Sequence, residues 1–454
     1  MLLGRTSELK HLNSYYDQEG SQIMVVYGQR NVGKTLLLKE FVQDKPNYYY
    51  LARSASEREQ QYQWGRELGK MDVKLPKYPS FSEIFQSIIS EKDNKKVIII
   101  DEFQYIVRNS DNFMKDLISF VHSYWQAQNV MIILSSSSIG WIENSMINKI
   151  GDAAYELSSF LKVKELSFDN MMEFFSGFSM EQCIESYAVL GGIPGLWEHF
   201  NDKLSLRENI CRFILDPCAL LKLEGQRIVE EELRETNVYN SILASIASGN
   251  HKLNDLFLHT DFSRAKISVY LKNLMELEIV EKIFSYDSEG KENTQKGIYR
   301  ISNHFVNFYF TYIYPNLTDL ESMVPSEFYK KHIMPTFRMY VAEYFKTVCR
   351  QHIEKWNQWG NLPIEIDRIG EWVGKLGSID VVAQNSQGKT IVSICNWDKP
   401  MMRYDDYEWL LFCCKEAKIP ADYVYLFSVR RFDEKLNLEA KVKNNLKLIS
   451  LEDM

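Results

Sequence analysis

The first third of the chain alternates short, almost wholly apolar runs with segments in which apolar residues recur at helical spacing. Apolar runs of this kind are typical of strands covered by helices on both faces. Helical spacing is found in Thr35 to Val42 and in Phe113 to Trp125. The predicted strands are Gln22 to Tyr27, Asn47 to Leu51, Val97 to Asp101 and Val130 to Leu134. This alternation predicts a parallel α/β domain, which we place at residues 1–160.

Helical periodicity replaces the strands from about Leu161, and we assign residues 161–236 to a helical lid. The expected helical segments are Asp169 to Phe175, Met180 to Leu190 and Leu206 to Glu235. Because Pro and Gly interrupt helices, Pro217 and Gly225 are expected to break the last of these segments.

Residues 237–318 show three helical patterns followed by two β-rich runs. The helices are expected at Ser241 to Ala247, Lys252 to Leu258 and Ser263 to Leu277. The strands are expected at Ile279 to Ser285 and Gly297 to Ile301, joined by the polar loop Tyr286 to Lys296. This order is typical of a winged helix-turn-helix.

The remaining residues, 319–454, indicate a second α/β domain. Its expected elements are a helix near Tyr340 to Ile353, a hairpin of Ser378 to Gln384 and Thr390 to Ile394, a helix around Tyr404 to Ala417, and a strand at Tyr423 to Ser428.

A phosphate-binding motif follows the first predicted strand. The sequence G-x-x-x-x-G-K-[ST] is matched in full, between a buried strand and an apolar helical run. In such a loop the backbone N–H groups surround phosphate oxygens, the lysine reaches the β- and γ-phosphates, and the hydroxyl coordinates Mg²⁺. The nucleotide contacts predicted here are Gly28, Gln29, Arg30, Asn31, Val32, Gly33, Lys34, Thr35 and Leu36.

Two further strand ends carry residues suited to hydrolysis. Val97 to Asp101 ends in adjacent carboxylates, of which Asp101 is predicted to hold Mg²⁺ with Thr35, and Glu102 to act as catalytic base. The next strand ends in four serines, and Ser136 or Ser137 could bond the γ-phosphate or the attacking water. We take Ser137 as the candidate, with a plain turn as the alternative.

Composition and charge narrow the function classes. With 53 Lys and Arg against 61 Asp and Glu, the net charge of −8 excludes a globally basic nucleic-acid coat, although a local basic patch is not excluded. No apolar run approaches the roughly 18 residues of a membrane span, and the N-terminus lacks the pattern of a signal peptide. The seven cysteines have no C-x-x-C spacing. These features predict a cytoplasmic protein without a membrane partner.

The base of the nucleotide is expected to be adenine. Guanine-selective proteins of the Ras-like branch carry an Asn-Lys-x-Asp loop, and Asn148 to Gly151 fails at its fourth position. The predicted cofactors are therefore ATP and Mg²⁺.

These motifs together resemble those of the archaeal-type ATPases, a signal-transduction branch of AAA+-like P-loop proteins. The resemblance rests on Gly4-Arg5-x-x-Glu8-Leu9, Asp101-Glu-Phe-Gln104, Glu165-Leu-Ser-Phe168 and Ala188-Val-Leu-Gly-Gly-Ile-Pro194. It implies that Gly4 and Arg5 lie near the adenine, and that Gly192 and Pro194 of the lid contact the nucleotide. A helix-to-helix turn is the alternative for the last two residues.

The resemblance also implies a C-terminal restriction-endonuclease-like domain of the PD-(D/E)-x-K type. Asp380 matches its strand acid. The next strand reads Ile394-Cys-Asn-Trp397 where relatives resemble Glu-Cys-Lys-Trp, and Lys346 stands where an acid is expected. Because one carboxylate makes a poor metal site, and a migrated Lys389 or Lys399 cannot replace the lost acids, we expect no nuclease activity.

The partner is the least determined part of the prediction. Across Tyr239 to Ile301 there are eight Lys or Arg and eight Asp or Glu, whereas DNA-binding modules usually carry a basic excess. The favoured reading is a switch in which slow ATP hydrolysis moves the lid and the winged helix and so changes binding of an unknown protein partner. The alternative is an ATP-dependent DNA-binding or DNA-processing protein, with Arg264 and Lys266 as anchors.

Overall fold

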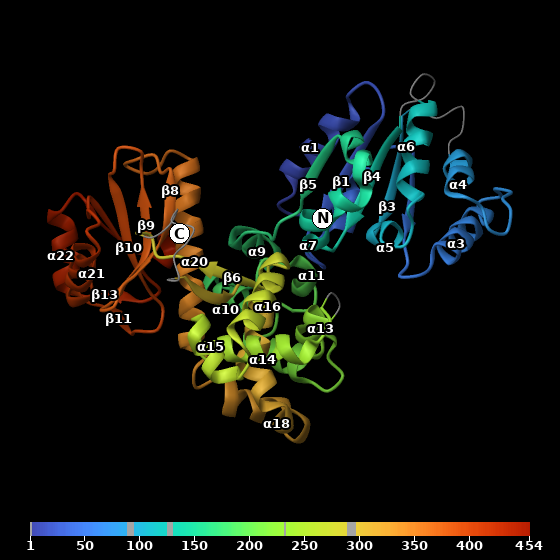
Figure 1. Ribbon diagram of the computed structural model, residues 1–454. Helices are drawn as coiled ribbons and strands as arrows, with labels where there is room; N and C mark the ends of the chain where they lie inside the picture. Colours follow the sequence, from blue (N-terminus) through green and yellow to red (C-terminus); the bar gives the residue numbers. More distant parts are fainter. Residues whose placement is uncertain (1, 89–94, 125–129, 231–232, 288–296) are drawn as a thin grey trace. The chain divides into compact units, whose positions relative to one another are not determined.

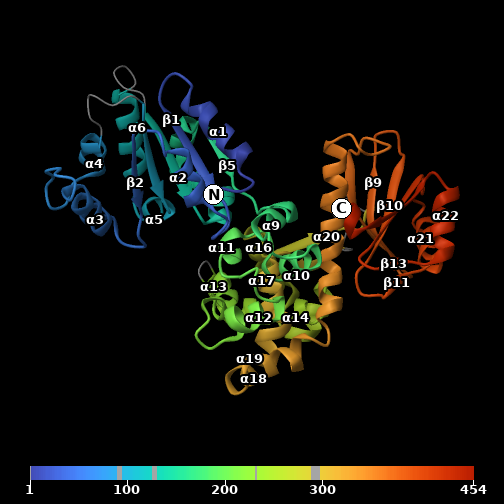
Figure 2. The same ribbon diagram turned by 180° about the vertical axis from the view of Figure 1, so that it is seen from behind.

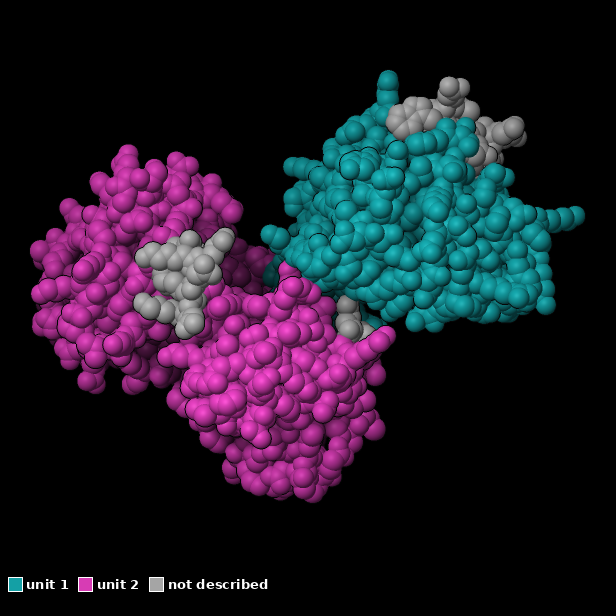
Figure 3. Space-filling view, in the orientation of Figure 1, with its two compact units in different colours: residues 1–166, 193–195 teal, residues 167–192, 196–454 magenta. Residues whose placement is uncertain are grey.

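The computed structural model describes the chain except residues 1, 89–94, 125–129, 231–232 and 288–296. Contacts within the chain divide it into two compact units, which Figure 3 draws in separate colours. The first comprises residues 1–166 and 193–195, and the second comprises residues 167–192 and 196–454. The finer division at residues 160, 236 and 318 stays a prediction.

The first unit is built on a five-stranded parallel sheet with the strand order β2-β3-β4-β1-β5. Its strands are β1 (Gln22–Tyr27), β2 (Asn47–Leu51), β3 (Lys96–Asp101), β4 (Val130–Ser136) and β5 (Ser159–Lys162). The four strands predicted from apolar runs are confirmed, and β4 extends two residues further, to Ser136. The edge strand β5 is short and mostly half-buried, so it lacks the apolar run that identifies the others.

Helices cover both faces of this sheet (Figures 1 and 2). One face packs against α1 (Thr6–Tyr16) and α2 (Lys34–Phe41). The other packs against α3 (Glu57–Gly69), α4 (Phe81–Ile88) and α6 (Phe113–Tyr124). The short elements are α5 (Gln104–Val107), α7 (Ile139–Trp141), the π-helix η1 (Ile142–Met146), α8 (Ile147–Ile150) and the 3₁₀ helix η2 (Gly151–Glu156).

The second unit begins with short helices. These are α9 (Phe168–Phe174), α10 (Met180–Leu190), α11 (Pro194–Trp197, whose first two residues belong to the first unit), α12 (Leu206–Ile210), η3 (Cys211–Leu215), η4 (Leu220–Lys222) and α13 (Glu224–Glu230). Pro217 separates η3 from η4, as predicted. The expectation for Gly225 is wrong, because this residue lies inside α13. A Cβ there would lie 2.4 Å from Cγ of Tyr309, so packing requires the glycine.

The next segment has the predicted order of three helices and two strands. Its elements are α14 (Thr236–Ala247), α15 (Leu253–Thr260), α16 (Arg264–Glu276), β6 (Val280–Ile283) and β7 (Ile298–Ile301). The two strands pair antiparallel. Most of the polar loop expected between them, residues 288–296, lies outside the described residues.

Helices then lead into the C-terminal sheet. They are α17 (His304–Phe308), η5 (Tyr309–Ile313), η6 (Tyr314–Asn316), α18 (Leu317–Ser322), α19 (Pro325–Phe328), η7 (Tyr329–Ile333) and α20 (Phe337–Gln358). The sheet has the order β14-β12-β10-β9-β8, with β14, β12 and β10 parallel and the other pairs antiparallel. Its strands are β8 (Arg368–Val373), β9 (Ser378–Gln384), β10 (Thr390–Asn396), β12 (Tyr423–Ser428) and β14 (Leu446–Ser450).

Figure 1 shows α20 on one face of this sheet and two helices on the other, α21 (Tyr404–Ala417) and α22 (Glu434–Val442). A small parallel pair, β11 (Met401–Met402) and β13 (Arg431–Phe432), and the 3₁₀ helix η8 (Leu451–Asp453) complete the unit. In the part of the chain that the structure describes, no helix has the length and hydropathy needed to cross a membrane.

Candidate active site

The phosphate-binding loop lies between β1 and α2, at the carboxyl end of the sheet. Two glycines are required by its geometry. A Cβ on Gly28 would lie 2.2 Å from the carbonyl oxygen of Val163, next to the end of β5. Gly33, immediately before α2, has φ +100°, a conformation that side chains disfavour. The loop thus turns sharply into the N-terminus of α2, where unpaired N–H groups favour an anion.

Lys34 is held by the loop itself. Its Nζ lies 2.9 Å from the carbonyl oxygens of both Gly28 and Gln29, and the residue is only 6% exposed. The ammonium group therefore lies inside the turn, next to the N-terminus of α2. This places a second positive charge where the loop is suited to receive phosphate.

Thr35 and Asp101 meet at the tip of the sheet. The hydroxyl of Thr35 donates to Oδ2 of Asp101 at 3.2 Å. The hydroxyl of Tyr49, from β2, donates to the same oxygen at 2.6 Å, and the backbone N–H of Glu102 donates to Oδ1 at 3.0 Å. Burial and the neighbouring Asp101 raise the pKa of Tyr49, so Tyr49 remains a donor at neutral pH. The carboxylate of Asp101 is thereby fixed beside the threonine.

Glu102 and Ser137 also lie in contact. Oε2 of Glu102 accepts from the Ser137 hydroxyl at 2.7 Å, from the Ser137 backbone N–H at 3.2 Å, and from Nε2 of Gln104 at 2.5 Å. Glu102 has φ +54°, a strained value for a residue other than glycine. Ser136 differs from Ser137, because its carbonyl accepts from Gly28 N–H at 3.3 Å and its hydroxyl accepts from Ser138 N–H.

Arg5 contacts the loop from outside the motif. It is 4% exposed, and its Nη2 donates to the carbonyl of Val32 at 2.8 Å, while Nη1 binds Glu8 at 2.8 Å. The structure thus gives Arg5 a bracing contact to the loop, and its predicted nearness to adenine stays a prediction. Gly4 is exposed and has φ +61°, and its role stays a prediction as well.

Residues 193–195 belong to the same compact unit as the loop, although they lie far along the chain. The backbone N–H of Gly195 donates to the carbonyl of Asn31 at 3.0 Å, and Cγ of Pro194 would lie 3.6 Å from a Cβ on Gly33. Pro194 therefore packs beside the phosphate-binding loop. Gly192 belongs to the second unit, so its predicted nucleotide contact stays a prediction.

The remaining predicted contacts follow from the course of the loop. Val32 is buried, whereas Arg30, Asn31, Thr35 and Leu36 are exposed. Sequence reasoning missed Tyr49 and Gln104 as supports of the two carboxylates. Gln104 is part of the motif Asp101 to Gln104, so the sequence contained a pattern from which its place at the site could have been predicted. No sequence pattern pointed to Tyr49, because its position beside Asp101 depends on the pairing of β2 with β3.

Residues 2–200 match a family described as an ATPase domain predominantly from Archaea. This part of the chain is an archaeal-type P-loop ATPase domain. Residues 309–407 of the chain match a second family, described as archaeal and bacterial proteins of unknown function. The matched ATPase domain includes the loop, both carboxylates, Ser137 and the segment 193–195.

Two curated proteins of Methanocaldococcus jannaschii are similar to the chain. An uncharacterized protein is 28% identical over 389 residues, which is 86% of this chain and 85% of the relative. An uncharacterized ATP-binding protein is 36% identical over 45 residues, which is 10% of this chain and 76% of the relative.

Solved structures to which the chain is similar include a Walker-type ATPase of Pyrococcus abyssi. It is 18% identical, with a TM-score of 0.49, and the match covers 68% of this chain and 96% of that one. The ORC2 protein of Aeropyrum pernix, in complexes with ADPNP and ADP, is 14% identical, with a TM-score of 0.44. The match covers 71% of this chain and 95% of that one.

Proposed function

We propose that the ATPase domain hydrolyses ATP in a Mg²⁺-dependent reaction, and that the cycle acts as a slow conformational switch. The observation that carries this proposal is the hydrogen-bonded arrangement of Thr35, Asp101, Glu102 and Ser137 next to Lys34. It joins the start of α2 to the ends of β3 and β4, where ligands of open α/β sheets bind.

The residues at the site fit a magnesium ion. Thr35 Oγ1 and Asp101 Oδ2 lie 3.2 Å apart, and both are the hard oxygen donors that Mg²⁺ prefers. Within the described residues no group of three or more His, Cys, Asp or Glu side chains could hold a metal ion. A P-loop site does not need one, because substrate phosphates and water complete the shell. When bound, Mg²⁺ neutralises negative charge on the phosphate oxygens.

Residues of the chain bind the phosphates, orient the attacking water and accept its proton. Lys34 and the N–H groups of the loop bind the phosphates of ATP. Glu102 orients the attacking water and accepts its proton, and Ser137 positions Glu102 through the 2.7 Å hydrogen bond.

The segment 193–195 is the proposed route from the loop to the rest of the chain. Its backbone binds Asn31, while the residues on either side of it in the sequence belong to the second unit. A change in the loop on nucleotide binding therefore acts on a segment that contains the first two residues of α11. We propose that this couples ATP to the helical lid and the winged helix, and through them to a protein partner.

DNA is the second candidate partner, acting through α16. Its basic side chains are already engaged by neighbours: Arg264 binds Asn254 at 2.5 Å, Lys266 lies 4.0 Å from Glu235, and Lys272 lies 3.7 Å from Glu276. The balanced charge of this segment favours a packing or protein-binding role over DNA binding.

We further propose that the C-terminal domain does not cleave nucleic acid. Lys346 Nζ lies 3.3 Å from Oδ1 of Asp380, and Cys395 N–H donates to Oδ2 at 2.9 Å. An ammonium group thus occupies the surroundings of the carboxylate that a catalytic metal ion would need. Incubating DNA with the protein and Mg²⁺ or Mn²⁺ should give no products. Cleavage that Asp380→Ala removes would contradict this proposal.

The decisive experiment compares two variants of the site. Lys34→Ala should abolish binding of fluorescent ATP, because the loop loses its buried cation. Glu102→Gln should retain binding and lose about 100-fold or more in phosphate release. The exposed residues Lys39 and Glu40 of α2 provide matched controls, and Lys39→Ala and Glu40→Gln should behave like wild type.

Two results would contradict the assignment. Unchanged ATP affinity in Lys34→Ala would exclude the proposed phosphate site, and hydrolysis at the wild-type rate in Glu102→Gln would exclude Glu102 as base. The switch is tested separately by comparing proteins captured by the ATP-bound Glu102→Gln form and by Lys34→Ala. Identical sets would contradict a nucleotide-dependent partner.

A further inference from the structure

A cavity of about 520 Å³ lies in the second unit, between the β6–β7 hairpin, α17 and α20. Its volume is within the range of sites for small organic molecules. Much of the wall is apolar or aromatic, including Ile298, Ile301, Tyr312, Tyr340 and Tyr344. The cavity is separate from the ATP site, which belongs to the first unit.

One wall carries a carboxylate that forms no ion pair among the described residues, although Arg300 and Arg350 act on it at longer range. Glu281 on β6 lies directly opposite Arg300 on β7, and opposite charges in such positions normally pair. Arg300 instead turns to Glu371, with Nη2 3.0 Å from Oε1. Within the described part of the chain, the Glu281 carboxylate has neither a hydrogen bond nor an ion pair, although its side chain is exposed in the cavity.

A second acceptor in the cavity is also unsatisfied. Nδ1 of His304 lies 2.7 Å from the carbonyl oxygen of Tyr187, and since a carbonyl only accepts, Nδ1 carries the hydrogen. Burial lowers the pKa of His304 to about 4, so the ring is neutral near pH 7 and Nε2 is an acceptor. Among the described residues Nε2 has no hydrogen-bond partner.

The other charged groups of the lining are already paired. Glu343 binds Lys346 at 3.0 Å, and Arg300 binds Glu371. The lining contains no lysine among the described residues. What the cavity offers to a ligand is therefore an unpaired carboxylate and a neutral imidazole acceptor beside three tyrosine rings, which also attract cations.

We propose that this cavity binds a small molecule carrying a primary amine or a guanidine group. Its N–H groups donate to Glu281 and His304, and its positive charge pairs with the carboxylate. A neutral molecule of the same shape lacks the charge-assisted bond, and an anion is repelled by Glu281. The proposal adds a ligand site to a region that the ATPase chemistry does not use.

Calorimetric titration of the 454-residue protein tests the ligand class. The probes are benzylamine, agmatine and spermidine, with benzyl alcohol and benzoate as neutral and anionic counterparts of benzylamine. We expect at least one amine to bind with a Kd below about 1 mM. We expect the alcohol and benzoate to bind at least about tenfold more weakly than benzylamine. No binding by any of the three amines, or equal binding of the alcohol, would overturn the proposal.

Variants test the residues. Glu281→Gln keeps the size of the side chain and should weaken amine binding at least about tenfold. Glu371→Gln should also weaken it, because Arg300 is then free to pair with Glu281. Glu276→Gln removes a carboxylate from α16, outside the cavity, and should change nothing. Unchanged affinity in both Glu281→Gln and Glu371→Gln would overturn the proposal.

The ATP site provides a further control. Lys34→Ala should retain amine binding, so failure of the proposed ATPase function and failure of the amine site give different results.

Discussion

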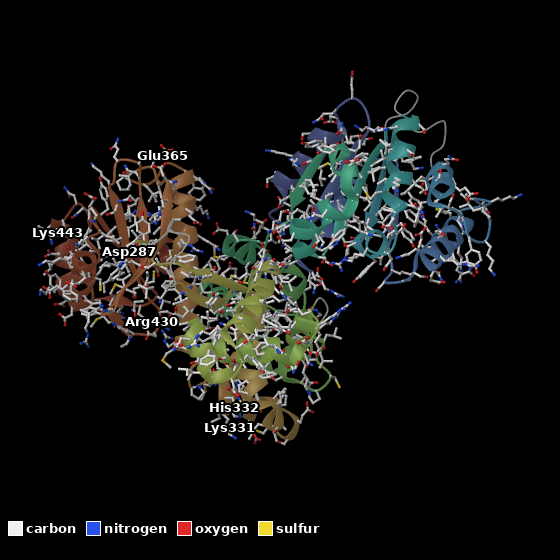
Figure 4. All side chains as sticks on the ribbon, viewed as in Figure 1. Asp287, Lys331, His332, Glu365, Arg430 and Lys443 are labelled. Atoms are coloured by element: carbon white, nitrogen blue, oxygen red, sulfur yellow. The ribbon has the colours of Figure 1, made fainter. Side chains whose placement is uncertain are left out.

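Glu185 on α10 is partly buried, and its carboxyl group allows a test of the electrostatics of the second unit. Burial, and then the like charge of Glu181 one turn away, raise its pKa to about 7, against the pull of Arg338 and Arg430. Glu181 already holds Arg430, with its two oxygens 2.6 and 3.2 Å from the guanidinium. Figure 4 labels Arg430, which is drawn with the C-terminal domain. The two arginines near Glu185, Arg338 and Arg430, thus form their ion pairs with Glu181.

The magnitude follows from the pKa. A rise from 4.5 to about 7 corresponds to about 3 kcal/mol of preference for the protonated form in the folded protein. Because the folded state binds this proton more tightly than the unfolded state, stability is lost as the pH rises from 4.5 through 7. The side chain keeps some contact with solvent, so Glu185→Gln should stabilise the protein by about 1–2 kcal/mol at pH 8 and hardly at all near pH 4.5.

Urea denaturation at several pH values measures this difference. Glu181→Gln is the matched control on the same helix, and it should destabilise the protein at pH 8 because Arg430 and Arg338 lose their partner. The reasoning would be refuted if the difference in free energy of unfolding between Glu185→Gln and wild type did not grow between pH 4.5 and pH 8. So would destabilisation by Glu185→Gln at pH 8.

Two further predictions concern the ATP site. Tyr49→Phe removes the 2.6 Å hydrogen bond to Asp101, worth about 1.5–3 kcal/mol, and should raise the Mg²⁺ concentration needed for hydrolysis, whereas Tyr50→Phe on the same strand should not. The same Mg²⁺ dependence in both would contradict the positioning role of Tyr49. Gly28→Ala brings a Cβ to 2.2 Å from the Val163 carbonyl oxygen and should lower ATP affinity at least about tenfold, as measured by nucleotide fluorescence. Wild-type ATP affinity in Gly28→Ala would contradict this prediction, because it would show that the loop accommodates the added Cβ.

The parts of the fold and site that could be predicted from sequence are those set by local pattern. Strands β1, β3 and β4 are buried on both faces and read as apolar runs, whereas the edge strand β2 is fully buried only at alternate positions. The loop from Gly28 to Thr35 has fixed spacing, and Asp101 with Glu102 follows a buried strand. Parallel strands bring such ends to one edge of the sheet, so their meeting could be expected.

The rest depends on contacts between distant residues. The hydrogen bond from Tyr49 to Asp101 follows from the register of β2 and β3, and Arg5 reaches Val32 across 27 positions. The unpaired state of Glu281 is set by Glu371, which draws Arg300 away from its strand partner. Sequence patterns give no register or side-chain direction at this range. For the same reason a glycine such as Gly225 cannot be assigned to a turn or to close packing from sequence alone.

Three of the contacts that hold the phosphate-binding loop come from near the start of the chain, from the segment 193–195 and from the residue after β5. The Arg5 guanidinium binds the Val32 carbonyl, the Gly195 N–H binds the Asn31 carbonyl, and Gly28 lies against Val163. Each contact involves the main chain of the loop, so each responds to the loop's conformation and not to the identity of its variable side chains. Gly195 is also tightly constrained, because a Cβ there would lie 2.7 Å from Cβ of Asn31.

This arrangement bears on how the proposed switch would work. Asn31 has φ +62°, and Gly33, two residues on, has φ +100°, so the carbonyl that binds Gly195 lies in the tightest part of the turn. A rearrangement of these peptides around phosphate would change the hydrogen bond to Gly195, since that bond is a direct main-chain contact. Gly195 itself lies in α11, whose last two residues belong to the second unit. If the proposed function holds, the conformational change that follows nucleotide binding is transmitted to the second unit through the backbone of residues 193–195. No charged side chain is required for this transmission.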